Sequence, residues 1–315
     1  MHKKYVLSIF LAIFLGLFAL GILLPSIPLS FADKIGNPNN TVITRVNVSN
    51  AAPYVFNISV MSPITLTPNT TTLVWCAAYV QDYNNWSDID VVNATFYDST
   101  HSQHNSIDYN TTHYTNMSCD NTTEIDTFTK LYNCTFNFWY NANPGAWVCN
   151  ITAADTVGIT ATANISATVN ELISLMVPDE INFGDVPVTN YSSNIPVNIT
   201  NVGNRNINVS LYAFGSAEND TLAMVCQYGN ISLNNERYTM WNGTSDLVPF
   251  ANMSLLNNSN TSASQIPQLT IFQYNATYNA SVNTTVWRLY VPVGPLGTPS
   301  GLCNGTVVFR AIRWA

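Results

Sequence analysis

Several segments of this chain alternate between apolar and polar residues, which is the pattern of a half-buried β-strand. In the clearest case, over residues 159–168, Ile or Ala alternates with Thr, Asn or Ser. The same two-residue period places four residues on one strand face: Val74, Cys76, Ala78 and Val80. After residue 32 no stretch has the 3.6-residue period of an amphipathic helix. The sequence therefore predicts an all-β fold of short antiparallel strands.

Further strands are expected wherever apolar residues share one face. In the first half these faces are Tyr54, Phe56, Ile58 and Val60; Cys134, Phe136 and Phe138; and Trp147, Cys149, Ile151 and Ala153. In the second half we expect an antiparallel run over residues 181–186, 195–200 and 207–214. Because domains cluster near roughly 100–150 residues, 315 residues are enough for two. We expect them over 42–170 and 171–315, after a polar spacer at 33–41.

The N-terminus has the features of an export signal. Lys3 and Lys4 precede an apolar run over residues 5–24, and Ser30-Phe31-Ala32 offers a cleavage site. The run is long enough to span a bilayer, so residues 1–32 are read either as a signal peptide or as an N-terminal membrane anchor. In both cases the positive end stays inside and the remaining chain is exported to the extracellular side. The membrane is expected to be contacted only through this segment.

The chain has six cysteines, an even number that predicts disulfides in an exported protein. None forms a C-x-x-C pair, which disfavours zinc and thioredoxin-like chemistry. Cys76 and Cys149 lie on the inward faces of two apolar strands, while Cys119 and Cys134 suit a hairpin. Cys226 is in line with Leu222 and Met224, and Cys303 with Val307, Phe309 and Ala311, so a bond between them within the second unit is the simplest arrangement.

Two motifs around the first pair, Leu73-Val74-Trp75-Cys76 and Gly145-Ala146-Trp147-Val148-Cys149, resemble strands B and F of immunoglobulin-like sandwiches. That resemblance implies a buried Cys76–Cys149 bond, although Trp86 lies in a loop and not in a third strand. Residues 181–186 and the stretch 291–303, the latter as a closing hairpin, are similar to immunoglobulin-like modules of archaeal and bacterial surface proteins. The resemblance implies two such sandwiches in tandem in an archaeal cell-surface or secreted protein.

Asn-x-Ser/Thr acceptors for N-glycosylation are unusually frequent. The chain has 25 of them, against about 8 expected from its 42 Asn and 59 Ser plus Thr. Many have an apolar middle residue, so on a strand the Asn would point outward and the middle residue inward. A composition effect without modification is the alternative. The main expected sites are Asn57, Asn93, Asn150, Asn164, Asn198, Asn208, Asn242 and Asn304.

Composition excludes a nucleic-acid partner. Charged residues make up 9% of the chain, the formal net charge is −8 and no basic patch exists. Asp82, Asp88 and Asp90 lie in the loop after the Cys76 strand, and Asp155 ends the Cys149 strand. In an immunoglobulin-like sandwich these two loops share one end, so the four carboxylates are candidate Ca²⁺ ligands. Turn-forming Asp is the alternative, and otherwise no cofactor is expected.

Other constellations point only weakly to chemistry. His101, His104 and His113 stand in a polar loop, where solvated histidines compete with a metal site. Possible sugar-binding aromatics are Trp86, Tyr109, Tyr114, Trp241 and Trp287, with core packing as the alternative. We therefore expect a non-enzymatic glycoprotein with a structural or adhesive role, contacting envelope or surface proteins or glycans. The alternatives are a carbohydrate- or calcium-dependent recognition module and an extracellular hydrolase.

Overall fold

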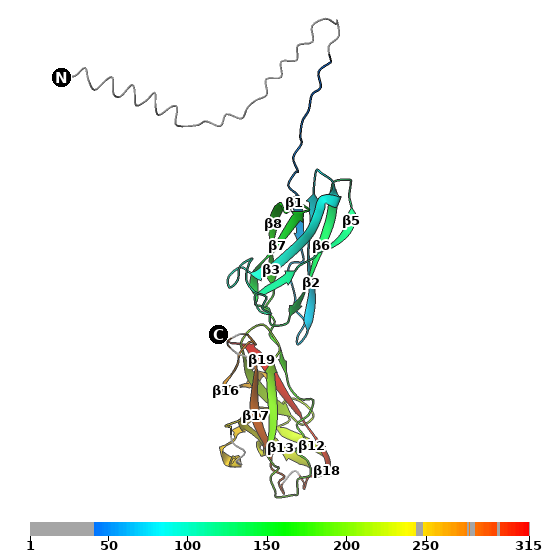
Figure 1. Ribbon diagram of the computed structural model, residues 1–315. Helices are drawn as coiled ribbons and strands as arrows, with labels where there is room; N and C mark the ends of the chain where they lie inside the picture. The colour runs from blue at the N-terminus through cyan, green and yellow to red at the C-terminus, as the bar shows by residue number, and fades with distance from the viewer. Residues whose placement is uncertain (1–40, 244–247, 276, 278–280, 295–296, 315) are drawn as a thin grey trace, which may run out of the picture. The chain divides into compact units, whose positions relative to one another are not determined.

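The computed structural model describes residues 41–315 except 244–247, 276, 278–280, 295–296 and 315 (Figure 1). The predicted signal peptide or anchor, including its apolar run, lies outside the described residues. Residues Asn50–Ala315 form one compact unit. Within the described part of the chain, no helix is both long and apolar enough to cross a membrane.

The described chain is all-β, as the sequence predicts. The strands before residue 172 are β1 (Tyr54–Val60), β2 (Thr71–Gln81), β3 (Ile89–Asp98), β4 (His113–Asn116), β5 (Asp120–Glu124), β6 (Thr129–Trp139), β7 (Gly145–Asp155) and β8 (Thr160–Val169). Those after it are β9 (Leu175–Met176), β10 (Ile195–Asn201), β11 (Ile207–Phe214), β12 (Leu222–Tyr228), β13 (Asn230–Ser232), β14 (Glu236–Met240), β15 (Ser254–Leu255), β16 (Ser264–Ile271), β17 (Val282–Leu289), β18 (Ser300–Asn304) and β19 (Thr306–Arg313). Single 3₁₀ turns are η1 (Trp86–Asp88), η2 (Leu233–Asn235), η3 (Phe250–Asn252) and η4 (Asn260–Ser262).

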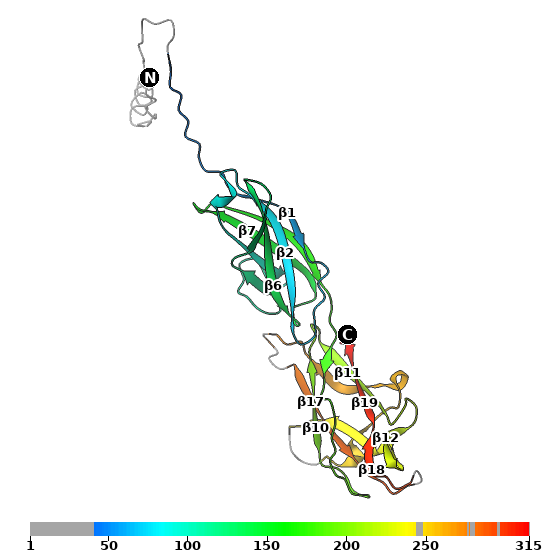
Figure 2. The same ribbon diagram turned by 90° about the vertical axis from the view of Figure 1, so that its right-hand side faces the viewer.

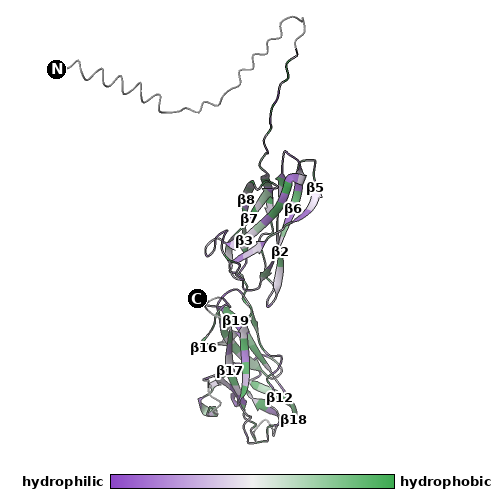
Figure 3. Ribbon diagram, in the orientation of Figure 1, coloured by the Kyte–Doolittle hydropathy of each residue, from purple (hydrophilic) through white to green (hydrophobic). Residues whose placement is uncertain are grey.

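Two four-stranded sheets, β1-β2-β6-β5 and β4-β3-β7-β8, form the first immunoglobulin-like sandwich (Figure 2). Their inward residues share one hydrophobic core, in which alternate residues from Val74 to Val80 on β2 and from Trp147 to Ala153 on β7 are fully buried. Hydrophobic and hydrophilic residues both occur along the strands of this sandwich (Figure 3), and the fully buried ones face inward. The predicted apolar faces on β2, β6 and β7 are confirmed. Burial of these alternating side chains is the main favourable term in forming the sandwich.

The predicted face of β1 is wrong at its start. Tyr54 is 59% exposed, whereas Val55 is buried and Ile58 packs on the core. The cause is a bulge between Phe56 and Ser59, where Asn57 has a left-handed φ of 50°. One extra residue in a bulge shifts the side-chain alternation, and Asn tolerates this conformation better than most residues. The bulge also leaves the Asn57 side chain exposed.

A separate core lies in the second β-sandwich, which is built from the strands after residue 172. Its sheets are β15-β14-β17-β10-β9, β16-β11-β19 and β13-β12-β18. β18 and β19 are separated only by Gly305, where an added Cβ would lie 1.8 Å from the Ala223 carbonyl oxygen. Glycine at this position therefore lets the chain pass from one sheet to the next. The boundaries proposed for the two domains, 42–170 and 171–315, stay a prediction.

The antiparallel run predicted at the start of the second half is confirmed in part. β10 and β11 form over the expected residues 195–200 and 207–214, but the first strand and the pairing are wrong. Residues 181–186 are not a strand, because the Asn182 side chain accepts a hydrogen bond from the Gly184 N–H and Gly184 has a φ of 68°. β10 and β11 do not pair with each other: β10 pairs with β9 and β17, and β11 with β16 and β19. Nor does β18 close a hairpin with the residues around 291, since its partner is β12.

The structure contains three disulfides, Cys76–Cys149, Cys119–Cys134 and Cys226–Cys303. The first joins β2 to β7 and is fully buried between the two sheets. The second joins the residue before β5 to β6, and the third joins cross-strand neighbours on β12 and β18. Each expected pair is thus present as a bond.

Candidate metal centre

Three carboxylates meet at one end of the first sandwich. Asp82 directly follows β2, Asp88 ends η1 just before β3, and Asp155 is the last residue of β7. One carboxylate oxygen from each residue lies within 4.8 Å of the others. Strand ends that are distant in sequence bring these residues together, as the loop placement in the sequence predicts.

Asp82 has an unsatisfied oxygen. Its side chain is fully buried, and Oδ1 accepts a hydrogen bond from the backbone N–H of Asn84 at 2.8 Å. The other oxygen, Oδ2, is buried and has no hydrogen-bond partner among the described residues. Burying a carboxylate oxygen without a partner costs free energy, and a bound cation would offset that cost.

The other two carboxylates are held in place by nearby donors. Asp155 Oδ1 accepts the backbone N–H groups of Val157 at 3.0 Å and Ile159 at 2.7 Å. Asp155 Oδ2 accepts the Asn50 side-chain amide at 2.7 Å. Asp88 accepts the Thr156 hydroxyl, and its carbonyl oxygen accepts the Thr156 N–H at 2.8 Å. The loop after β7 therefore positions both residues.

The cluster is electrostatically unfavourable without a cation. Burial raises the pKa of Asp82, and the charges of Asp88 and Asp155 raise it further, against a lowering effect of the Asn84 hydrogen bond. No ion pair to the three carboxylates occurs among the described residues. The nearby Lys130 instead lies 3.4 Å from Glu124 and 3.2 Å above the Trp86 ring.

The donor set fits Ca²⁺. Calcium prefers six to eight hard oxygen ligands in flexible geometry, and water completes many such sites. Asp82, Asp88 and Asp155 would supply the carboxylates, and the ion would satisfy Asp82 Oδ2 while removing the mutual repulsion. Asp90, the fourth expected ligand, is exposed on β3 and is not part of the group.

The three histidines are not brought together as metal ligands. His101 Nδ1 contacts Asp98 Oδ2 at 2.6 Å, and His113 Nδ1 contacts Asp108 Oδ1 at 2.8 Å. His104 Nδ1 accepts hydrogen bonds from Thr95 at 2.7 Å and from Asn150 at 2.9 Å. His101 and His113 are therefore bonded to carboxylates in or beside the loop that connects β3 to β4, while His104 ties that loop to β3 and β7.

Five of the eight expected glycosylation acceptors are exposed: Asn57, Asn164, Asn198, Asn242 and Asn304. Asn93 and Asn208 are half-buried. Asn150 contradicts the expectation that such acceptors point to solvent, because it is buried and its amide donates to His104. The sequence pattern identified the strand face, but not the loop that covers it.

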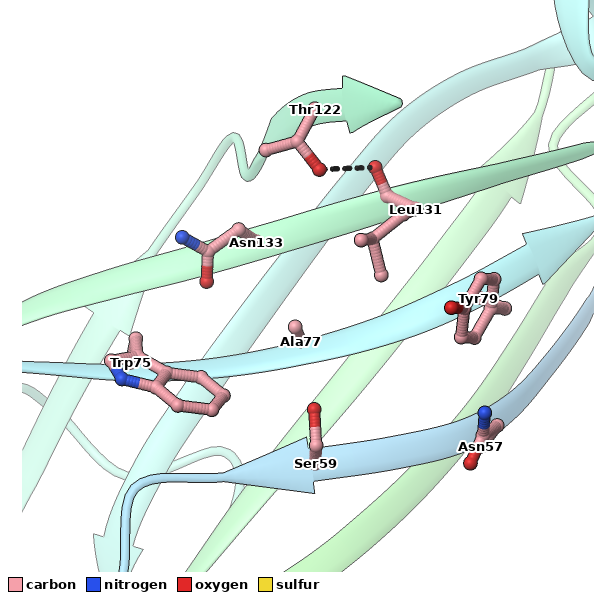
Figure 4. Close-up of a pocket in the computed structure, with 8 residues that line it drawn as sticks. All are labelled: Asn57, Ser59, Trp75, Ala77, Tyr79, Thr122, Leu131 and Asn133. Atoms are coloured by element: carbon pink, nitrogen blue, oxygen red, sulfur yellow. Dashed lines mark hydrogen bonds between the residues drawn. The ribbon is translucent and has the colours of Figure 1, made fainter. Parts of the chain in front are cut away.

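Two of the five aromatics named as possible sugar-binding residues pack in the interior, as the core-packing alternative expects, whereas Tyr109 and Trp241 are exposed. Trp287 is fully buried in the second core, and Tyr114 stacks on Phe138 with 4.2 Å between ring centroids. Sequence reasoning missed Trp75 and Tyr79, which line a shallow groove on the outer face of β2 (Figure 4). The sequence could have identified both residues, because those that alternate with the inward Cys76 and Ala78 must point outward.

Comparisons with known proteins add little. No protein-family model and no curated protein sequence matches the chain. A solved chaperone–tip adhesion subunit complex, CsuC–CsuE from the archaic chaperone-usher Csu pili of Acinetobacter baumannii, matches at 12% identity and a TM-score of 0.35. That match covers 81% of this chain and 99% of the other. The C-terminal domain of the Streptococcus agalactiae AgI/II polypeptide BspA matches at 9% identity and a TM-score of 0.22, over 81% and 90%. At these scores, function has to be argued from this chain's own residues.

Proposed function

We propose that this chain is an exported, N-glycosylated surface protein whose two sandwiches serve a structural or adhesive role, without catalysis. Its partners are other envelope or surface proteins, or glycans. The observation that carries the proposal is that all six cysteines form disulfides, one of them at the centre of a core. Such bonds persist in oxidising compartments outside the cytoplasm.

The outer strand faces support a contact role. On β8, outward Thr160, Thr162 and Asn164 alternate with Ala161 and Ala163, which pack on the core. Hydroxyl and amide groups hydrate such a face without fixed charge and supply hydrogen bonds to a partner. Sugars on its acceptors would also shield strand edges from intermolecular pairing.

Export and modification are tested by the intact mass of protein purified from its natural source. The mass should fall when N-glycans are removed enzymatically, and should rise on reduction by one hydrogen for each of the six cysteines. An unchanged mass after deglycosylation would exclude the glycoprotein assignment. An unchanged mass after reduction would exclude the disulfides.

The contact role is tested with beads that carry the purified glycoprotein. Folded protein should bind to envelopes of the source organism, or make beads cluster, above the level of reduced and alkylated protein. That control keeps the sequence and the glycans but removes the fold. Equal binding by both forms would contradict a role that depends on the sandwiches.

A second candidate function, Ca²⁺-dependent recognition, is favoured by the unsatisfied buried oxygen of Asp82 beside Asp88 and Asp155. An ion there would join the loop after β2 to the loop after β7 and stiffen that end of the sandwich. Calorimetry of the folded protein with CaCl₂ should show saturable binding and a higher melting temperature. No heat and no shift at millimolar Ca²⁺ would remove this candidate, leaving the contact role untouched.

A further inference from the structure

The outer face of the β1-β2-β6-β5 sheet carries a groove of about 500 Å³ (Figure 4). Trp75 and Tyr79 lie on β2 with the small side chain of Ala77 between them, and Asn57 and Ser59 line the groove from β1. Four residues along a strand span roughly 13 Å, so the two rings bound a floor that is long enough for a short oligosaccharide. The groove is open to solvent, since Trp75 is 38% exposed.

Tyr79, the aromatic residue of the groove that lies nearest to Asn57, is held in place by its neighbours (Figure 4). The Tyr79 ring stacks on Phe56 with 5.7 Å between centroids, and Phe56 in turn stacks on Tyr54 at 5.4 Å. Phe56 is also the register partner of Tyr79 across the β1–β2 pair. A stacked, pre-oriented ring loses little conformational freedom when a flat apolar surface packs on it, as the C–H face of a pyranose does.

Asn57 is a glycosylation acceptor set into the edge of this groove. It heads the sequence Asn57-Ile58-Ser59, and the β1 bulge turns its side chain outward while Ile58 packs on the core. Ser59 lies opposite Ala77 in the register. The attachment point and the groove floor are therefore on neighbouring strands, about 4.8 Å apart.

The groove also contains an unsatisfied acceptor. Asn133 lines it from β6, and its Oδ1 is buried without a hydrogen-bond partner among the described residues. A buried carbonyl oxygen of this kind can be satisfied by a donor from outside the chain, such as water or a ligand hydroxyl. A sugar hydroxyl is such a donor, and the same sugar presents an apolar face to an aromatic ring.

We propose that the N-glycan attached to Asn57 folds back into this groove, packing its first sugars over Ala77 and Tyr79 and reaching toward Trp75. A sugar hydroxyl donates to Asn133 Oδ1. The proposal rests on the proposed function, because it requires export and N-glycosylation. The groove would then bind the protein's own glycan and not a foreign saccharide, because the glycosylation acceptor Asn57 itself lines the groove.

The test measures oxidation of Trp75 by hydroxyl radicals, read by peptide mass spectrometry on secreted, glycosylated protein. Ser59→Ala removes the acceptor but keeps Asn57, whose left-handed conformation Asn tolerates. Ser166→Ala is the matched control, because it removes the exposed acceptor Asn164 on β8 in the other sheet. We expect Trp75 to oxidise severalfold faster in Ser59→Ala and at the wild-type rate in Ser166→Ala.

Equal Trp75 oxidation in wild type and Ser59→Ala, with Asn57 shown to be occupied, would overturn the proposal. Bare Asn57 with Asn164 occupied would overturn it as well and leave the proposed glycoprotein function standing. If every acceptor is bare, both proposals fail. As a second readout, Trp75→Ala should make the Asn57 glycan more susceptible to endoglycosidase, and an unchanged cleavage rate would count against the proposal.

Discussion

Cys76 and Cys134 lie directly opposite each other in the register of β2 and β6, yet they form disulfides with different partners. Both side chains are fully buried on the same inward face. Cys76 crosses to β7 in the facing sheet, while Cys134 bonds to Cys119 beside its own sheet. The first disulfide therefore ties the two sheets together, and the second ties the β5 edge.

Loss of the Cys76–Cys149 bond should destabilise the protein more than loss of Cys226–Cys303. The two bonds close loops of similar length, with separations of 73 and 77 residues, so their chain-entropy terms are close. Each double Cys→Ala variant should lose about 2–5 kcal/mol of unfolding free energy. The buried pair should lose roughly 1–3 kcal/mol more, because its sulfurs leave cavities in a core. Urea denaturation monitored separately for each sandwich measures both, and equal losses would contradict the core contribution.

Asp82→Asn should abolish the rise in melting temperature caused by Ca²⁺, and should raise the melting temperature of the ion-free protein by a few degrees. The amide keeps the shape of the buried group and removes its charge, which two neighbouring carboxylates oppose. Asp90→Asn is the matched control, since Asp90 is exposed and outside the cluster. Thermal unfolding with CaCl₂ and with EDTA tests this. A Ca²⁺ response that survives Asp82→Asn would place the ion elsewhere.

The same cluster predicts a pH dependence with a definite sign. The pKa of Asp82 is raised in the folded state, so folding retains a proton that the unfolded chain loses. In ion-free protein, Asp82 therefore contributes most to the unfolding free energy below the ordinary pKa of Asp. This contribution declines as the pH rises through the raised pKa of the folded state. Saturating Ca²⁺ should reverse this, because the ion binds the ionised form. Melting curves from about pH 3.5 to 7 with and without Ca²⁺ should diverge with increasing pH, whereas parallel curves would exclude the site.

Glu236→Gln should stabilise the second sandwich above neutral pH. Glu236 is 2% exposed on β14, and burial raises its pKa from 4.5 to about 8. The folded state keeps the proton through that interval, so unfolding free energy falls as pH rises from about 4.5 to about 8, by on the order of 3–5 kcal/mol from this group. In Glu236→Gln, the unfolding free energy measured by urea denaturation should depend much less on pH over this interval. The exposed Glu180→Gln is the control, and an unchanged pH dependence in Glu236→Gln would refute the assignment.

Asn150 should be bare in folded, secreted protein, while Asn164 on the adjacent strand carries sugar. The two are register partners on β7 and β8, and their sequons both have Ile in the middle. Asn150 is buried with its amide bonded to His104, whereas Asn164 is exposed. Glycopeptide mass spectrometry decides this, and a high occupancy at Asn150 would show that the β3–β4 loop does not cover the sheet as described.

The bulge at Asn57 and the turn at Gly184 show where prediction from the sequence failed. In both places the backbone adopts a left-handed conformation that interrupts a regular period of two. Alternation predicts which side chains share a strand face only while the strand is regular. One inserted residue therefore reverses the predicted faces of the residues that precede it. Strand pairing was also predicted wrongly, because β10 and β11 were expected in one antiparallel run but belong to different sheets.

By itself, the sequence determined the all-β class, the inward faces of β2, β6 and β7, and the loops that carry Asp82 and Asp155, because these depend on local periodicity and chain order. Tertiary structure alone decided that Asp90 lies outside the carboxylate group, that Asn150 is covered, and that Trp75, Tyr79 and Asn57 line one groove. Such features depend on register and on which loop packs over which sheet face. Those arrangements are set by contacts between residues far apart in the chain. The two-residue alternation of apolar and polar side chains is local and does not encode such contacts.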